Sequence, residues 1–151
     1  MHIKTADGIV VDIDREHMQA HASVMPFLKQ IIPTLVVDDQ VLIKADFDMG
    51  EIIGLTDCVE TTQYDEIIYA KRPGRPGKTR FVKNRKQQPS SHVTVIMKRV
   101  GNRFKLLTSF IGKVAEKELF DKSIRTDEEF MQSKHFWDRH ALVWGSQEVE
   151  S

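Results

Sequence analysis

The stretch HVTVIMKRVGNRFKLLTSFI, residues 92–111, indicates the fold expected for this chain. Residues 92–98 and 104–111 are rich in β-branched and aromatic side chains, a composition typical of strands. Between them, residues 99–103 contain a glycine followed by an asparagine, which favours a turn. The stretch therefore predicts a β-hairpin.

A helical pattern precedes this hairpin. Apolar side chains recur at three- and four-residue spacing over residues 14–32, which marks one face of a helix. Pro26 lies inside this run and is expected to kink the helix or split it in two. Shorter strand patterns follow within residues 35–83, interrupted by a loop at 73–78 that is rich in proline and glycine.

Beyond the hairpin the pattern becomes helical again, over residues 115–120 and 128–141. The chain is thus expected to be α+β, with an N-terminal helix, an antiparallel meander sheet and a C-terminal helical cover. We expect one domain over 1–151, with its core at about residues 14–112 and an aromatic helical cover at 113–146.

Composition limits the class of protein. The chain has 151 residues, of which 40% are hydrophobic and 29% charged, which is ordinary for a globular domain. It contains neither an apolar run long enough for a membrane span nor an N-terminal signal pattern, so we expect a cytoplasmic protein without a membrane partner. Cys58 is the only cysteine, which excludes an intramolecular disulfide and a zinc site built on several cysteines. No cofactor or metal is expected.

The formal net charge of +0 conceals a strong separation of charge along the sequence. Residues 71–105 hold twelve lysines and arginines and no acids, whereas residues 1–70 hold thirteen acids and four bases. Such a basic segment is typical of proteins that bind the RNA backbone. Two other interpretations remain: a solvated face that pairs with the acidic residues 1–70, and a surface for an acidic protein partner.

The RNA interpretation assigns phosphate contacts to the cations and base stacking to one aromatic ring, Phe81. The candidate nucleic-acid-binding residues are Lys71, Arg72, Arg75, Lys78, Phe81, Lys83, Lys86 and Lys98.

A candidate catalytic set lies beside them. RNA cleavage without a metal needs a general base, a general acid and cations that stabilise the charged transition state. His92 is the candidate base or acid, Arg80 and Arg85 are the candidate cations, and Ser109 or Thr108 is an orienting hydroxyl. Hairpin pairing is expected to place a residue near Phe110 opposite His92. In the alternative interpretation, His92 only begins a strand and is hydrogen-bonded to the turn at 90–91.

Two resemblances accompany these patterns. Residues 91–98 and 104–112, with the basic turn between them, resemble the final hairpin of the barnase–EndoU–colicin–RelE superfamily of small ribonucleases. This resemblance covers residues 14–112 and implies catalytic His, Arg, Lys or Ser/Thr residues on a sheet face. Residues 79–85 and 133–145 are similar to runs in a set of bacterial proteins without an assigned activity.

Together these features predict a metal-independent endoribonuclease of the kind found among bacterial and phage toxins. The alternative is a non-catalytic module that binds RNA or protein.

Overall fold

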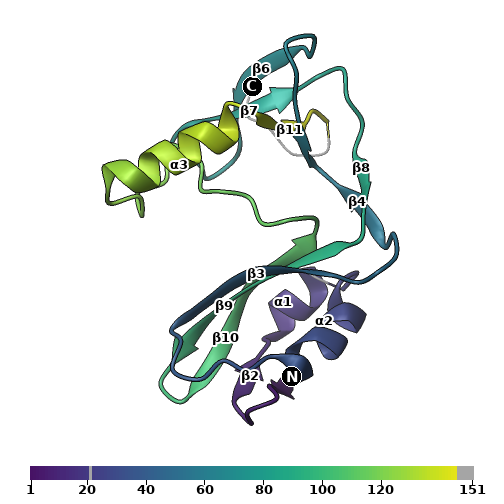
Figure 1. Ribbon diagram of the computed structural model, residues 1–151, viewed down its shortest axis with the longest axis vertical. Coiled ribbons are helices and arrows are strands. Elements are labelled where there is room, and N and C mark those ends of the chain that lie inside the picture. The colour runs from purple at the N-terminus through teal and green to yellow at the C-terminus, as the bar shows by residue number, and fades with distance from the viewer. Residues whose placement is uncertain (21, 146–151) are drawn as a thin grey trace. The chain divides into compact units, whose positions relative to one another are not determined.

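The computed structural model describes residues 1–20 and 22–145, with the side chains of residues 17 and 20 outside the description (Figure 1). The fold is α+β, and strands make up more of it than helices. The chain forms two compact units. Unit 1 comprises Met1–Gly54 and Ser90–Val114, and unit 2 comprises Leu55–Pro89 and Ala115–Ser151. The expected core at residues 14–112 is therefore divided between the two units.

Unit 1 is built on a five-stranded sheet. Its strands, in order across the sheet, are β1 (His2–Lys4), β2 (Val10–Asp12), β10 (Arg103–Ile111), β9 (His92–Val100) and β3 (Leu42–Asp48). Strand β10 runs antiparallel to β9 but parallel to β2. The sheet is therefore mixed rather than the antiparallel meander that the sequence predicted.

The hairpin of residues 92–111 is confirmed, with longer strands and a shorter turn than expected. Val100 pairs with Arg103, which leaves Gly101 and Asn102 as the turn. Gly101 has a φ of 65°, a left-handed conformation that glycine adopts at low cost. Farther along, the register between β10 and β9 shifts at residue 107, between Leu106 and Thr108, as at a β-bulge.

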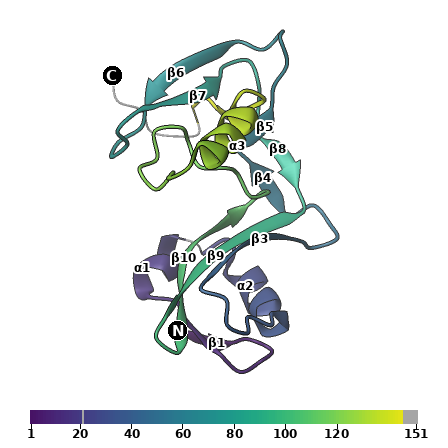
Figure 2. The same cartoon turned by 60° about the vertical axis from the view of Figure 1, so that its left-hand side comes forward.

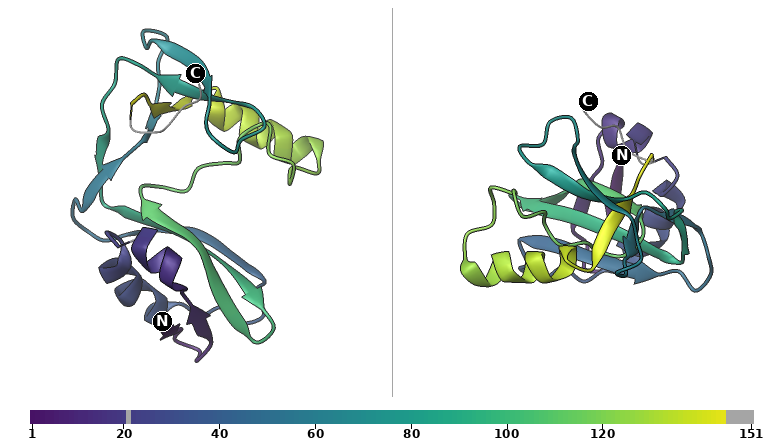
Figure 3. Two further views of the ribbon diagram at one scale, coloured as in Figure 1. Left: turned by 180° about the vertical axis from the view of Figure 1, so that it is seen from behind. Right: turned by 90° about the horizontal axis from the view of Figure 1, so that it is seen from above.

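Helices cover one face of this sheet (Figure 3). They are α1 (Arg15–Ala20), α2 (Met25–Ile31) and the 3-10 turn η1 (Ile32–Thr34). Pro26 lies in the first turn of α2, where a missing N–H breaks no helical hydrogen bond, so the predicted helix is split in two. Because β1 and β2 precede α1, the expected order of a helix followed by the sheet is corrected.

The core of unit 1 lies between these helices and the sheet. Burying one such aliphatic or aromatic side chain contributes roughly 1.5–3 kcal/mol. The fully buried members include Val11, Ile13, Leu28, Ile32, Val93, Val95, Met97, Phe104 and Leu106.

Unit 2 contains a second, four-stranded sheet (Figure 2). Its strands, in order, are β5 (Cys58–Glu60), β11 (His140–Val143), β7 (Lys78–Val82) and β6 (Ile67–Lys71). Its small core consists of Val59, Val82, Ala141 and Val143, with Ile67 packed against them. Two further short strands, β4 (Gly54–Thr56) and β8 (Gln88–Ser90), pair where the chain passes between the units.

The C-terminal region differs from the predicted helical cover. It contains one helix, α3 (Asp127–Trp137), and then β11, which pairs with β5 and β7. Residues 115–120 are not helical. Their carbonyl groups are used elsewhere, because the Trp137 indole Nε1–H donates to the carbonyls of Glu116 and Lys117, at 3.1 Å each. None of the helices in the described ranges has the length and apolar run needed to cross a membrane.

Candidate nucleic-acid interface

The sheet of unit 1 presents a second face, opposite its core. Residues alternate between the two faces along each strand, and Val93, Val95 and Met97 of β9 point into the core. His92, Thr94, Ile96 and Lys98 therefore belong to the other face, which we call the outer face. Unit 1 has no helix on this face among its described residues (Figure 3).

Two lysines lie directly opposite each other on the outer face. Lys98 of β9 pairs with Lys105 of β10, and both side chains are exposed. Lys44 of β3 is a diagonal neighbour, because Leu42 is the residue that pairs with Lys98. None of these three ammonium groups has a hydrogen-bond or ion-pair partner among the described residues. We call Lys44, Lys98 and Lys105 the lysine patch.

The nearest acid on β2 does not neutralise this patch. Asp12 pairs with Lys105 in the sheet register, but its carboxylate accepts a hydrogen bond from Arg103 at 2.6 Å. His2 Nδ1 lies 2.6 Å from the same oxygen. The Arg103 hydrogen bond is the main reason that the pKa of Asp12 lies below its usual range. Its charge is therefore already compensated.

His92 lies on the same face, at the other end of the strands. Its Nδ1 is 2.9 Å from Oδ1 of Asp46, and its Nε2 is 3.9 Å from Oδ2 of Asp48. The backbone N–H of Val114 donates to the second oxygen of Asp46 at 3.0 Å, which fixes that carboxylate. The backbone N–H of Gly50 is the main cause that lowers the pKa of Asp48. The histidine ring is therefore held between two carboxylates.

His92 also has the local contact foreseen in the alternative interpretation. Its backbone N–H donates to the Ser90 hydroxyl at 3.1 Å. This contact uses only the backbone N–H of His92, so it leaves ring atom Nδ1 to Asp46 and does not involve Nε2.

The predicted hydroxyl partners do not lie opposite His92. The register shift pairs Phe110 with Thr94, and the backbone of Gly112 reaches His92 instead. Ser109 pairs with Val95, so it faces the core, where it is 2% exposed and donates to the Thr94 carbonyl at 2.7 Å. Thr108 pairs with Ile96 on the outer face, four residues along β9 from His92 and thus roughly 13 Å away. The expected proximity of these hydroxyls to His92 is wrong.

The two predicted catalytic arginines belong to unit 2, whereas His92 belongs to unit 1. Arg80 Nη1 donates to the Thr61 hydroxyl at 2.9 Å and to the His140 carbonyl at 2.8 Å. Arg85 Nη1 donates to Asp65 Oδ2 and to the Glu60 carbonyl, both at 3.2 Å. Both guanidinium groups therefore hold unit 2 together.

Three other arginines of the basic segment are bonded in the same way. Arg72 pairs with Glu118 at 2.6 Å, and Arg103 pairs with Asp12. Arg99 donates to the carbonyls of Asp38 and Gln40. One open interpretation was that the basic segment pairs with the acidic residues 1–70. Arg103 and Arg85 do so, through Asp12 and Asp65, whereas Arg72 pairs with Glu118 outside that stretch and Arg99 bonds only to carbonyl groups.

The remaining residues predicted to contact RNA are either buried or exposed in unit 2. Phe81 is 0% exposed and packs edge-on against Trp144 at 5.3 Å, so its ring offers no surface to a base. Lys71 and Lys78 face each other across β6 and β7 in the same way as the lysine patch pair. The exposed cations of unit 2 in this set are Lys71, Arg75, Lys78, Lys83 and Lys86.

Sequence reasoning missed Asp46 as the partner of His92. Asp46 and Asp48 are two residues apart on a strand, so their side chains lie on the same face of it. Only the pairing of β3 with β9 brings this face beside His92. No group of three or more His, Cys, Asp or Glu side chains suited to a metal occurs in the described part of the chain. Burial raises the pKa of the Cys58 thiol to about 12, which makes it a poor nucleophile.

Comparison with known proteins adds no relative. No family model matches the chain, and neither the curated proteins nor the solved structures include a match.

Proposed function

We propose that this protein binds RNA, and that the lysine patch on the outer face of unit 1 makes the main phosphate contacts. The observation that carries this proposal is the direct opposition of Lys98 and Lys105 without an acidic partner. Like charges directly opposite in a sheet are unfavourable. A phosphate backbone placed over them removes that repulsion and releases counterions.

The rest of the outer face suits a single strand. Phe110 lies on this face and is 38% exposed, which leaves part of its ring open to a stacked base. Thr108 lies between Phe110 and the lysine patch and offers a hydroxyl. An aromatic ring on the same face as a group of cations suits single-stranded nucleic acid, because a strand that contacts the lysines with its phosphates can stack a base farther along.

A salt titration with single-stranded RNA tests this proposal. The logarithm of the binding constant falls linearly with the logarithm of the salt concentration. Each lost phosphate contact reduces the steepness of this fall by about 0.7 for a single strand. The double variant Lys98→Gln/Lys105→Gln should therefore bind RNA more weakly, and its salt dependence should be less steep by about 1.4.

Lys29→Gln is the matched control, because Lys29 is an exposed lysine on α2, on the helical side of the sheet. The control should bind like the unmodified protein. Absence of binding by the unmodified protein, or equal weakening in both variants, would refute the proposal.

RNA cleavage is a second candidate function, favoured by the hydrogen bond between His92 and Asp46. In this arrangement Asp46 orients the ring through Nδ1, and Nε2 is the atom that takes or gives a proton at the substrate. Ser109, Arg80 and Arg85 have no part in it, because their polar groups are bonded within the fold.

Incubation of single-stranded RNA with the protein in EDTA tests cleavage. His92→Ala should lower the cleavage rate by about 10²–10⁴ and leave binding unchanged, since general acid–base catalysis contributes on that scale. Asp46→Asn should also lower the rate, and Lys29→Gln should not. Full activity of His92→Ala would remove His92 from the reaction, and intact RNA throughout would leave only the binding function.

A further inference from the structure

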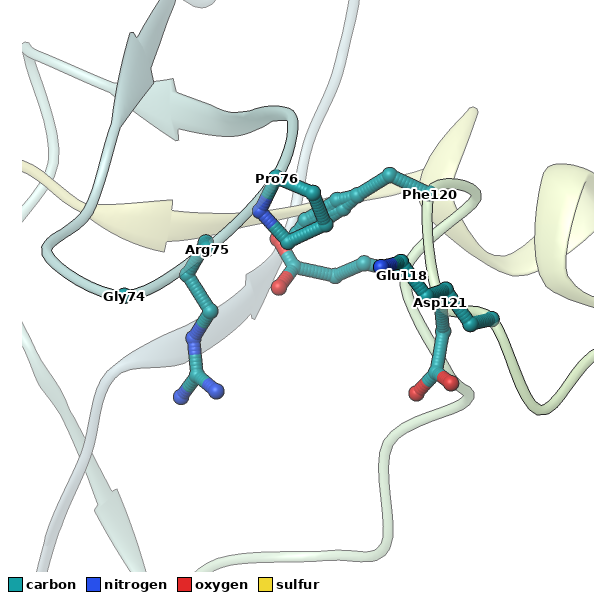
Figure 4. Close-up of a pocket in the computed structure, with 7 residues that line it drawn as sticks. Gly74, Arg75, Pro76, Glu118, Phe120 and Asp121 are labelled. Atoms are coloured by element: carbon teal, nitrogen blue, oxygen red, sulfur yellow. The ribbon is translucent and has the colours of Figure 1, made fainter.

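Unit 2 contains a pocket beside the turn that joins β6 to β7 (Figure 4). Its volume is about 550 Å3, within the range of small-molecule sites. The residues that line it are Gly74, Arg75, Pro76, Glu118, Phe120, Asp121 and Lys122.

The walls of the pocket are held in place by contacts within unit 2. Arg72 pairs with Glu118 at 2.6 Å, and both side chains are less than one-fifth exposed, at 17% and 16%. Phe120 packs against Gly77 so closely that a Cβ on Gly77 would lie 2.7 Å from the ring. The pocket is therefore formed before a ligand arrives, which lowers the entropy cost of binding.

Arg75 is the one arginine of residues 71–105 whose guanidinium has no partner among the described residues. Lys122 adds a second cation to the pocket lining. The Arg75 guanidinium can hold an anion such as a phosphate, for which the arginine fork is well suited.

The other side of the pocket is acidic. Figure 4 shows the Asp121 carboxylate across the opening from the Arg75 guanidinium. The backbone N–H and the hydroxyl of Ser123 donate to Asp121 at 2.8 and 2.7 Å, so the carboxylate is fixed in position. A ligand that fits both sides carries an anionic group at one end and hydrogen-bond donors at the other. Pro76 and Phe120 supply apolar surface between them.

We propose that this pocket binds a mononucleotide. The phosphate lies on Arg75, the base packs against Pro76 and Phe120, and Asp121 accepts a hydrogen bond from a ribose hydroxyl or an exocyclic amine. The site is separate from the lysine patch, which lies in unit 1. Asp121 offers a hydrogen-bond acceptor to the sugar or base, so a nucleotide should bind more tightly than inorganic phosphate, which has only the contact with Arg75.

Calorimetric titration of the full chain with adenosine, cytidine, guanosine and uridine monophosphates tests this assignment. Inorganic phosphate and adenosine serve as the two partial probes. At least one monophosphate should bind, and both partial probes should bind more weakly. Phosphate that binds as tightly as every nucleotide, or an absence of binding by all four monophosphates, would overturn the proposal.

Matched variants locate the site. Arg75→Gln should weaken nucleotide binding by about ten- to a hundredfold, because it removes a charged hydrogen bond. Arg125→Gln removes an exposed arginine that does not line the pocket, and it should leave the affinity unchanged. Equal affinity of Arg75→Gln and the unmodified protein would place the nucleotide elsewhere. The variant Lys98→Gln/Lys105→Gln should bind the nucleotide with unchanged affinity. Failure of the RNA-binding proposal can therefore be distinguished from failure of the nucleotide proposal.

Discussion

At the scale of single residues, Asp7 joins two segments that stand 30 residues apart in the chain. Its carboxylate accepts from the Thr5 hydroxyl at 2.6 Å and from the backbone N–H groups of Val37 and Asp38 at 3.1 and 2.9 Å. The Thr5 hydrogen bond is the largest cause that lowers the pKa of Asp7, to about 2. The contact ties the turn after β1 to the loop before β3.

The pH dependence of stability should report this contact. A carboxyl group with a lowered pKa stabilises the fold above its unfolded pKa of about 3.8, and the stabilisation is lost as pH falls toward about 2. Urea unfolding of Asp7→Asn should therefore show a lower midpoint than the unmodified protein at pH 6. The difference should shrink as pH approaches 2. Asp39→Asn, in the same loop, is the control, and a difference that does not vary with pH would contradict this account.

At the scale of secondary structure, one hairpin in each unit carries a pair of directly opposed lysines. Lys98 faces Lys105 across β9 and β10, and Lys71 faces Lys78 across β6 and β7. Because Lys98 and Lys105 have no acidic partner among the described residues, their opposition lowers the stability of the hairpin that carries them. The proposed RNA contact thus comes with a cost in the free protein.

This cost is measurable in Lys98→Glu. The variant places opposite charges across β9 and β10, with Lys44 as a second neighbour, and should stabilise the fold by about 0.2–1 kcal/mol. RNA binding should fall in the same variant. Urea midpoints at low and high salt provide the test, since the gain should be smaller at high salt. A lower midpoint at low salt would show that the lysines do not repel each other.

The close packing of Gly77 against Phe120 gives a prediction for unit 2. Gly77→Ala places a methyl group 2.7 Å from the ring and should destabilise the protein by about 1–3 kcal/mol. In a Phe120→Ala background the same change should cost less, because the clashing ring is absent. The free energy of unfolding is measured by denaturant titration for the unmodified protein, the two single variants and the double variant. An equal loss from Gly77→Ala with and without the Phe120 ring would mean that the ring is not the obstacle.

Some elements followed directly from the sequence and others did not. The hairpin of residues 92–111 was predictable because its alternation and its Gly101 turn are local signals. Residues 115–120 resemble a helix in composition, but contacts with Trp137 and Arg72 hold them in an irregular course. Ser109 and Thr108 do not meet His92 because the turn is shorter than expected and a register shift at residue 107 changes the pairing, and no residue near it signals the shift. Arg80 and Arg85 are bonded within unit 2, which only the tertiary structure shows. Asp46 became visible only through strand pairing.

At the scale of the whole molecule, the charge separation along the sequence is cancelled within each unit. Unit 1 holds nine acids and nine bases, and unit 2 holds thirteen of each. Acids from residues 1–70 pair with the basic segment, as in the contacts of Asp12 with Arg103 and Asp65 with Arg85. The proposed RNA-binding surface therefore consists of Lys44, Lys98 and Lys105, which have no acidic partner among the described residues.

Truncation should separate the two units. A chain shortened to residues 1–114 keeps all of unit 1 but removes α3 and β11 from unit 2. We expect slow hydrogen exchange of the Val95 and Met97 amides to persist and protection in β6 and β7 to be lost. NMR-detected exchange measures both. Loss of protection throughout would mean that unit 1 depends on unit 2 for its stability.

The interleaved order of the strands also bears on synthesis at the ribosome. Strands β2 and β3 have their partners in β9 and β10, so the sheet of unit 1 waits for residue 111 to leave the exit tunnel. Until then, α2 and β3 have been synthesised, but the strands against which their apolar faces pack have not. The sheet of unit 2 waits longer, because β11 lies between β5 and β7. The nascent chain therefore exposes apolar, aggregation-prone surface for most of its translation. A chaperone that binds unfolded chains has a long interval in which to protect it.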